Sequence, residues 1–302
     1  MTSRVVILGG TGFLGSHLSK RLHAEGFDVV SVGRRTVGQR DAHLCLDVFE
    51  IEDLAPLLSE ADFCVHLVTD TVPSSAEKHG YGGVERNLNF AFRLADACIK
   101  AGVRKLLFSS SGGTVYGQDV PDAREDGPCA PIGLYGMQKL AVETALRSRL
   151  RRSSCKLVNL RIANPYGAGQ ERQRAHGLVG HLLAALIKST PFTVWGDGTQ
   201  VRDYVHVDDV IEAFFAAMSY AGDEDVFNVG SGAGTSTNEM IRICEGIVGN
   251  ELSVTHGAHP AYDVDRIYLN IDKSRRHLGW TPKIAMREGI ERYYYDLTET
   301  VK

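Results

Sequence analysis

The sequence lacks the features that mark a membrane protein, a nucleic-acid-binding protein or a metal site. No apolar run reaches the ~18 residues of a membrane span, and the N-terminus carries no apolar signal-peptide core. The 33 basic residues form no long block and are outnumbered by 37 acidic ones, so neither nucleic acid nor an anionic membrane is an expected partner. No C-x-x-C, H-x-x-x-H or mixed cluster occurs, which predicts no metal. The six cysteines are scattered, as is typical of buried thiols in a reducing compartment, and we expect a cytoplasmic protein.

The sequence does contain a regular alternation of short β-rich runs with longer helical patterns. The expected strands are residues 5–8, 29–32, 63–68, 105–109 and 156–161. The expected helices between them are residues 15–25, 51–58, 84–101 and 134–150. This alternation predicts a parallel sheet covered on both faces, and right-handed crossovers make it doubly wound.

The alternation stops at Asn164, where a stretch rich in glycine, proline and polar residues begins. We expect residues 1–163 to form the doubly wound domain, which the chain re-enters at about residues 203–229. Residues 164–302 are then expected to form mainly a smaller α/β lobe at the C-terminus that binds the substrate. The predicted fold class is therefore α/β, with a doubly wound parallel sheet and a second, smaller lobe.

A glycine-rich turn joins the first expected strand to the first expected helix. Gly9, Gly12 and Gly15 follow the spacing G-x-x-G-x-x-G. The first glycine allows a tight turn, the second lets the backbone approach a pyrophosphate, and the third lets the helix pack closely on the strand. The N–H groups and the dipole at a helix start favour an anion. In a strand–turn–helix setting, this spacing predicts a dinucleotide-binding (Rossmann) domain.

The end of the second expected strand leaves the choice between NAD and NADP open. An acidic residue at this place, ~20 residues after the turn, binds the ribose hydroxyls of NAD. The sequence has Gly33, Arg34 and Arg35 instead, and either arginine suits the 2′-phosphate of NADP unless both are simply solvated. Asp47, with Val48 beside it, follows the next short strand, and its carboxylate is expected to accept from the adenine amine.

A tyrosine and a lysine stand four residues apart at the start of an expected helix. Tyr135 and Lys139 therefore share one helix face. A tyrosine has a pKa of ~10 in water, which is too high for a base at pH 7. A nearby ammonium and a cationic nicotinamide ring both favour the phenolate. The pair follows the fourth expected strand, where a doubly wound sheet opens toward its ligand, and predicts a base that oxidises a hydroxyl.

Such a base needs a hydroxyl donor that holds the reacting oxygen. The strand at residues 105–109 runs on into a serine-rich end and a glycine pair. Ser111 is the expected donor, and Thr114 is the alternative.

With these motifs in this order, the chain resembles the extended short-chain dehydrogenase/reductase family of the NAD-dependent epimerase/dehydratase type. Within that family it is most similar to nucleotide-sugar epimerases such as UDP-glucose 4-epimerase. The matching motifs are residues 9–15, 47, 109–117, 135–139, 161–167, 194–198, 202–209 and 278–280. The resemblance implies a hydride that leaves C4 of the sugar for the nicotinamide and returns to the other face of the ring.

The resemblance also implies roles for individual residues. Tyr135 would be the base, Lys139 its modulator and Ser111 the hydroxyl donor. The implied cofactor contacts include Phe13, Leu14, Leu67, Val68, Thr69, Asn87 and Ser109. The implied substrate contacts are Asn164 for the sugar nucleotide, Val194 and Trp195 for its base, Arg202 for the diphosphate, and Arg266 in place of an arginine that the family often carries before Asp263. The family's dimers imply a homodimer through the helices at residues 84–101 and 134–150.

Three functions remain open on the sequence alone. The first is a nucleotide-sugar 4-epimerase acting on a UDP-hexose. The second is an NADP-dependent nucleotide-sugar reductase, which uses the same residues. The third is a non-catalytic dinucleotide sensor, although an intact Tyr135, Lys139 and Ser111 would serve no purpose there. A 4,6-dehydratase is not expected, because Gly112 and Gly113 stand where it needs an acid/base pair.

Overall fold

The computed structural model describes residues 2–34, 42–170 and 177–299, and these residues pack into two units. The first unit contains the described residues up to Ser111 together with Gly133–Arg161 and Ile211–Phe227. The second unit contains Gly112–Ile132, Ile162–Val210 and the described residues from Asn228 onward. Packing thus assigns residues 112–132 to the second unit, whereas the sequence analysis placed them in the first domain.

A seven-stranded sheet forms the centre of the first unit, in the order β12-β7-β5-β4-β1-β2-β3. Its strands are β1 (Arg4–Leu8), β2 (Asp28–Gly33), β3 (Ala42–Cys45), β4 (Phe63–His66), β5 (Lys105–Ser111), β7 (Lys156–Ile162) and β12 (Val226–Val229). The central strand β1 pairs in parallel with β2 on one side and with β4 on the other. The chain therefore reverses its direction across the sheet at β1 and β4, and ligands bind outside the carboxyl ends of strands at such a point. The predicted doubly wound fold is confirmed.

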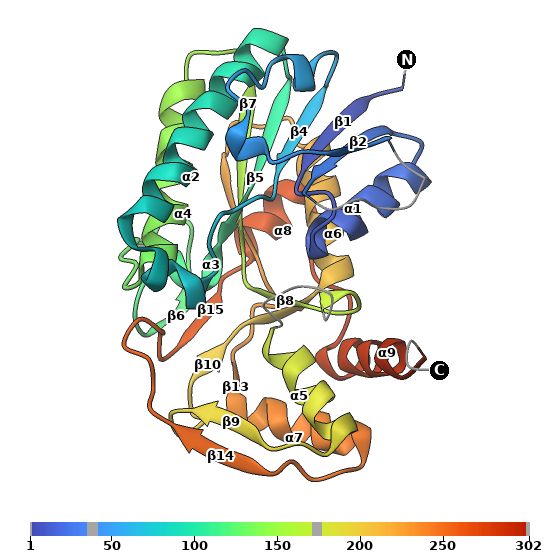
Figure 1. Ribbon diagram of the computed structural model, residues 1–302, viewed down its shortest axis with the longest axis vertical. Coiled ribbons are helices and arrows are strands. Elements are labelled where there is room, and N and C mark those ends of the chain that lie inside the picture. Colours follow the sequence, from blue (N-terminus) through green and yellow to red (C-terminus); the bar gives the residue numbers. More distant parts are fainter. Residues whose placement is uncertain (1, 35–41, 171–176, 300–302) are drawn as a thin grey trace. The chain divides into compact units, whose positions relative to one another are not determined.

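Helices cover both faces of this sheet (Figure 1). On one face α2 (Pro73–Ala101) and α4 (Leu134–Leu150) lie side by side. The other face carries α1 (Phe13–Ala24) and α6 (Val207–Ser219), whose residues from Ile211 on belong to the first unit. Leu94 of α2, Val142 of α4 and Leu106 of β5 are buried together in the apolar core. No helix in the described part of the chain is long and apolar enough to cross a membrane.

Two helical predictions were wrong in their extent. Residues 51–58 form no α-helix, and only the 3-10 turn Pro56–Leu58 is helical. Pro56 lacks an N–H and is tolerated only in the first turn of a helix, while Asp53 accepts from the Ala55 amide and caps the turn locally. The helix α2 begins at Pro73 rather than at residue 84, and a non-helical backbone at Gly80 interrupts it.

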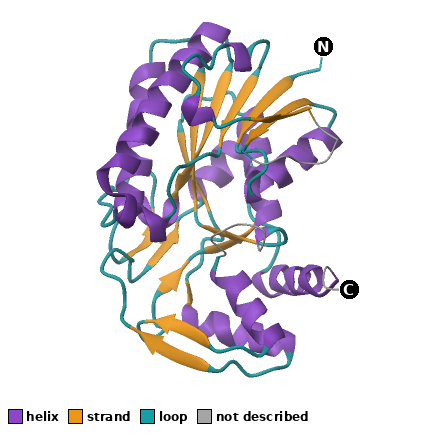
Figure 2. Ribbon diagram, in the orientation of Figure 1, coloured by secondary structure: helices purple, strands orange, loops and turns teal. Residues whose placement is uncertain are grey.

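The second unit packs helices against short strand pairs (Figure 2). Its helices are α3 (Gly112–Val115), α5 (Leu178–Lys188), α7 (Thr237–Val248), α8 (Asp272–Leu278) and α9 (Met286–Glu299). Its strands are β6 (Val120–Ala123), β8 (Asn164–Tyr166), β9 (Phe192–Trp195), β10 (Val201–Arg202), β11 (Tyr204–His206), β13 (Thr235–Ser236), β14 (Val254–Gly257) and β15 (Ile267–Leu269). The helices α5, α7 and α9 share a core in which Leu182, Met240 and Tyr293 are fully buried.

A buried lysine connects β5 to the end of α6 within the first unit. The ammonium of Lys105 donates to the carbonyl oxygens of Ala217 (2.9 Å), Met218 (2.6 Å) and Tyr220 (2.6 Å). These carbonyls lie at and just beyond the helix C-terminus, where no further turn supplies N–H donors. A cation is also favoured by the helix dipole there.

Replacing this lysine should destabilise the fold without touching the candidate site. We expect Lys105→Met to lower the free energy of unfolding by about 2–4 kcal/mol, because three carbonyl groups lose their donor. Urea unfolding followed by circular dichroism measures this change. Lys156→Met is the matched control, since Lys156 makes only an exposed ion pair with Asp223, and it should stay within about 0.5 kcal/mol. Equal stabilities for the two variants would contradict the role of Lys105.

Candidate active site

The glycine turn between β1 and α1 has the close backbone packing that its spacing predicts. A Cβ on Gly15 would lie 2.1 Å from the Gly9 carbonyl oxygen, and Gly9 itself has a φ of +93°. A Cβ on Gly10 would lie 2.0 Å from Ser31 Oγ. Side chains are therefore excluded at Gly10 and Gly15, and the positive φ at Gly9 favours glycine there as well, so the backbone of the turn can approach a ligand closely.

The first turn of α1 is open to an anion. Gly12 is the N-cap, no side chain caps the helix, and no acidic residue lies in its first turn. The first N–H groups of a helix have no partner within the helix, so they remain as donors here. Phe13 and Leu14 begin this turn. These features fit the pyrophosphate of a dinucleotide.

The end of β2 packs against the glycine turn. A Cβ on Gly33 would lie 2.4 Å from Thr11 Oγ1, so a larger side chain here would require the Thr11 side chain to move. Arg34 is exposed, and its Nη1 lies 3.9 Å from Asp47 Oδ2. Asp47 also accepts from the Phe49 amide at 3.1 Å, which fixes its carboxylate after β3, whereas the Val48 side chain is buried. Arg35 lies outside the described residues.

Tyr135 and Lys139 lie on the inner side of α4, which packs on β5. Lys139 Nζ donates to the Ser109 carbonyl oxygen at 2.8 Å and lies 5.7 Å from the centre of the Tyr135 ring. It also lies 4.9 Å from the centre of the Phe108 ring. The lysine is only 4% exposed, so its charge is held close to the tyrosine with little water around it.

Burial shifts the proton equilibria of both residues toward their neutral forms. It raises the pKa of Tyr135 to about 12. It lowers the pKa of Lys139 to about 8, while the charge of Glu143 acts in the opposite direction. The chain without cofactor therefore holds Tyr135 as a phenol at neutral pH. A phenolate requires additional positive charge beside the ring, which a cationic nicotinamide would supply.

The serines at the end of β5 alternate in direction. Side chains along a strand point to opposite faces, so Ser109 and Ser111 share one face and Ser110 points to the other. Ser110 is buried and donates to Glu143, which excludes it from a substrate-binding role. Thr114, in α3 of the second unit, has a buried hydroxyl with no hydrogen-bond partner among the described residues.

The loop after β4 is tied to both helices on its side of the sheet. Gln138 of α4, which is 2% exposed, accepts from Thr71 Oγ1 at 3.0 Å and donates to Thr69 Oγ1 at 3.1 Å. Asn87 of α2 accepts from the Asp70 amide at 3.2 Å. The glycine turn lies close to this loop, because a Cβ on Gly9 would contact Val68 and Leu67 at 3.2–3.3 Å. Leu67, Val68 and Thr69 are thus positioned as a second wall beside the turn.

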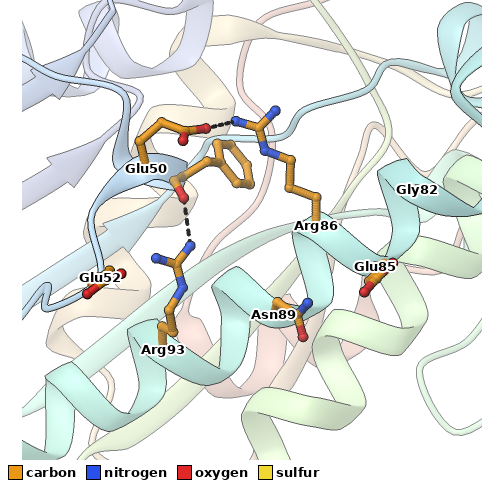
Figure 3. Close-up of a pocket in the computed structure, with 8 residues that line it drawn as sticks. Glu50, Glu52, Gly82, Glu85, Arg86, Asn89 and Arg93 are labelled. Carbon is orange, nitrogen blue, oxygen red and sulfur yellow. Dashed lines mark hydrogen bonds and ion pairs between the residues drawn. The ribbon is translucent and has the colours of Figure 1, made fainter.

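A hollow lined mainly by charged side chains, those of Arg86 and Arg93 and of three glutamates, adjoins this side of the first unit (Figure 3). Arg86 of α2 lies 5.0 Å from the centre of the Phe49 ring and forms an ion pair with Glu50. Its guanidinium also lies 3.6 Å from Asp70 and 4.0 Å from Asp47. Arg86 therefore connects the loops that follow β3 and β4, the same loops that carry the expected adenine-binding and cofactor-lining residues.

The predicted substrate-binding residues of the second unit differ in how freely they present their side chains. Asn164 donates to the Asp203 carbonyl oxygen at 2.9 Å. The Val194 side chain is buried in the core of its unit, so any ligand contact is left to its backbone. Trp195 is 59% exposed, and its ring lies against Gly257, where a Cβ would approach it to 2.7 Å.

Arg202, the predicted diphosphate ligand, is bonded within its own unit. Its Nη2 donates to Asp263 Oδ1 at 2.6 Å and to the Val264 carbonyl, and its Nη1 donates to the Val201 and Asp265 carbonyls. A diphosphate would have to replace some of these partners. The half-exposed Arg266 forms an ion pair with Asp119 at 2.8 Å.

The doubly wound sheet, the glycine turn after β1 and the tyrosine–lysine pair on α4 together define an extended short-chain dehydrogenase/reductase. The chain belongs to the NAD dependent epimerase/dehydratase family, whose sequence model matches residues 5–230. The family resemblance predicted from the sequence is confirmed.

Individual relatives align over nearly the whole chain. The UDP-glucose 4-epimerase of Mycolicibacterium smegmatis is 34% identical, over 95% of this chain and 96% of the relative. The crystal structure of the Thermotoga maritima UDP-glucose 4-epimerase with UDP-glucose superposes with a TM-score of 0.92 at 29% identity, covering 99% of this chain and 100% of that one. The Thermus thermophilus UDP-glucose 4-epimerase in complex with NAD gives a TM-score of 0.89 at 30% identity, covering 98% and 99%.

Sequence reasoning missed several residues that organise this site. Gln138, Glu143 and Arg86 are polar residues on helices whose partners lie far away in the sequence. The sequence contains one indication for Glu143. It lies four residues after Lys139 and therefore on the same helix face as the expected catalytic pair. A charged residue on that face predicts a buried partner, but the sequence does not say which one.

A side chain on the glycine turn should impair cofactor binding selectively. We expect Gly15→Ala to weaken NAD affinity at least about tenfold, because its Cβ would collide with backbone at Gly9 and displace the turn. Isothermal titration calorimetry measures the dissociation constant. Gly82→Ala is the control, since no atom lies within 4 Å of a Cβ there, and its affinity should be unchanged. Unaltered NAD binding by Gly15→Ala would rule out the turn as the pyrophosphate site.

Proposed function

We propose that this chain is an NAD-dependent nucleotide-sugar 4-epimerase that acts on a UDP-hexose. The observation that carries the proposal is the buried pairing of Lys139 with Tyr135 on α4, in a unit whose glycine turn is shaped for a dinucleotide. The relatives named above are UDP-glucose 4-epimerases, and two of them are known in complex with UDP-glucose or with NAD. The first unit would bind the dinucleotide and the second would bind most of the sugar nucleotide.

The proposal assigns a separate task to each of the residues expected to take part in catalysis. Tyr135 accepts the proton of the sugar C4 hydroxyl and later returns it, as a base and then an acid. Lys139 favours the phenolate by its charge and bonds the nicotinamide ribose. Ser111, or Thr114 in its place, donates a hydrogen bond to the reacting oxygen. When bound, NAD supplies a hydride acceptor that returns the hydride after the 4-keto sugar has turned over.

The ion pair at the end of β2 supports NAD over NADP. Arg34, the described arginine that would hold a 2′-phosphate, lies near the carboxylate of Asp47. That carboxylate offsets the charge of Arg34 and would repel a phosphate placed between them. We also propose a cytoplasmic location, a reducing environment in which the cysteine thiols, none of which forms a disulfide in the structure, remain reduced.

Epimerisation should proceed without net redox change. We expect the purified protein to interconvert UDP-glucose and UDP-galactose, or their N-acetyl forms, with no stoichiometric change at 340 nm. Tyr135→Phe should reduce kcat by about 100-fold or more, because the proton acceptor is lost. Product separation by anion-exchange chromatography measures the reaction. Steady consumption of NADPH with a keto-sugar nucleotide would instead identify a reductase, and NAD binding without any turnover would identify a sensor.

We further propose a homodimer formed through α2 and α4. Phe92 and Ile99 of α2 are 42% and 38% exposed, and their spacing of seven residues places them on one helix face. Large apolar side chains exposed on one face of α2 favour a partner surface, and a second copy is the partner that the family resemblance implies.

A charge on this face should separate the subunits. We expect Phe92→Glu to convert a dimer into a monomer at micromolar concentration, because two buried carboxylates would face each other across the two-fold axis. Light scattering coupled to size-exclusion chromatography measures the mass. Tyr295→Glu, at an exposed position on α9 of the second unit, should remain dimeric. A monomeric unsubstituted protein would refute the dimer.

A further inference from the structure

A fully buried ion pair lies one helical turn beyond the catalytic lysine. The side chains of Glu143 on α4 and Arg161 on β7 are 1% and 5% exposed. Arg161 Nε donates to Glu143 Oε1 at 3.1 Å, and its Nη2 donates to Oε2 at 2.8 Å. The free energy needed to remove two charges from water often exceeds the energy gained from their mutual attraction. An apolar pair of similar volume would therefore fill this space equally well. The placement of this pair therefore calls for another explanation.

The carboxylate of Glu143 fastens α4 to two neighbouring strands. It accepts from Ser110 of β5 in addition to Arg161 of β7. Lys139, one turn earlier, donates to the carbonyl of Ser109, the residue next to Ser110. The helix is thus held on β5 at two successive residues, and the second contact limits how far Lys139 can move along the strand.

The charge of Glu143 acts on the same lysine. Burial lowers the pKa of Lys139, and the negative charge of Glu143 raises it again. The other groups that face Lys139 do not replace this effect. His66 of β4 has its pKa lowered to about 3 by burial and by Lys139, so it is neutral at working pH. Tyr135 is a phenol until the cofactor binds, and Arg161, which is bonded to Glu143, carries a positive charge, which would lower the pKa of Lys139 and not raise it.

We propose that Glu143 is a positioning residue for the epimerase reaction: it fixes the Lys139 ammonium on the Ser109 carbonyl and supplies the buried negative charge that keeps this group protonated. This inference rests on the proposed function, because the tyrosine base needs a charged lysine beside it. Glu143 contacts neither substrate nor cofactor in this role, and it acts through Lys139 alone.

The direction in which the pH profile of kcat should shift follows from the protonation state of Lys139. Activity requires the ammonium form, so it falls as pH rises through the pKa of Lys139. Removal of the Glu143 charge lowers that pKa, and the alkaline limb of the kcat profile moves to lower pH. We expect a displacement of about one pH unit in Glu143→Gln, which is about a tenfold loss of kcat on the alkaline side and a smaller loss near pH 6.5.

The experiment compares pH profiles with a direct titration of the lysine. NAD-saturated protein carrying [¹³C]lysine is titrated by NMR, and the Lys139 Cε resonance is assigned by its absence in Lys139→Met. The midpoint should fall in Glu143→Gln together with the alkaline limb of kcat, and Glu143→Asp should restore both in part. Arg147→Gln is the control, since Arg147 lies one turn further along α4 in an exposed pair with Asp225 and should leave both midpoints unchanged.

A second variant keeps the proposal testable if Glu143→Gln fails to fold. The double variant Glu143→Gln/Arg161→Met removes both buried charges, so no unpaired arginine remains. The proposal expects the Lys139 midpoint to fall in this variant as well. A folded double variant with the original Lys139 midpoint and pH profile would overturn it, because Glu143 would then serve only to neutralise Arg161.

The two readouts separate this inference from the proposed function. Absence of epimerase activity in the unsubstituted protein would defeat the proposed function, and the NMR midpoint would still report whether Glu143 controls Lys139. Normal epimerase activity with an unmoved midpoint in Glu143→Gln would defeat only the role of Glu143.

Discussion

The buried ammonium of Lys139 links the position of α4 to that of β5. An ammonium transferred from water to a protein interior loses its hydration, and it remains charged only if nearby groups replace that hydration. Here the replacements are the Ser109 carbonyl, the face of the Phe108 ring and the negative charge of Glu143. All three depend on the register of α4 against β5. The charged state of Lys139 therefore requires this register, and the contacts of Lys139 in turn help to fix it.

The strand order explains why these groups meet the expected cofactor site. The chain starts at β1, builds β2 and β3 on one side, and then crosses to β4 and β5 on the other. The glycine turn after β1 and the loop after β4 therefore follow two neighbouring parallel strands from which the chain continues to opposite sides of the sheet. In doubly wound folds, ligands bind outside the carboxyl ends of the strands at such a point. Gln138 connects that loop to α4, the helix that carries Tyr135 and Lys139. One helix thereby aligns the proposed catalytic pair with the loop that lies beside the glycine turn.

Sequence reasoning succeeded where the physical requirement is local. The turn at Gly9–Gly12–Gly15 excludes side chains within a few residues, and the Tyr135–Lys139 spacing equals one helical turn, so both are visible without tertiary structure. It did not reveal interaction partners that are remote in the sequence. Arg202 is bonded to Asp263 sixty-one residues later, and Glu143 is bonded to Arg161 on a different strand. The helix expected at residues 51–58 failed for a local reason that periodicity overlooks, because Pro56 allows a helical turn only from its own position onward.

The high pKa of Tyr135 bears on when the base forms. Bringing that pKa from about 12 to near neutrality requires a difference of about 7 kcal/mol between the two protonation states. Lys139 is already in place and charged in the structure, yet burial still dominates the tyrosine. The remaining stabilisation must come from a charge that arrives with the ligand, and the positive ring of an oxidised nicotinamide has the required sign. In the proposed reaction the chain alone is a poor base, and the phenolate would form only in the complex that holds a hydride acceptor. Proton removal would then be coupled to the presence of the oxidised cofactor, so Tyr135 would not act on a hydroxyl whose hydride has nowhere to go.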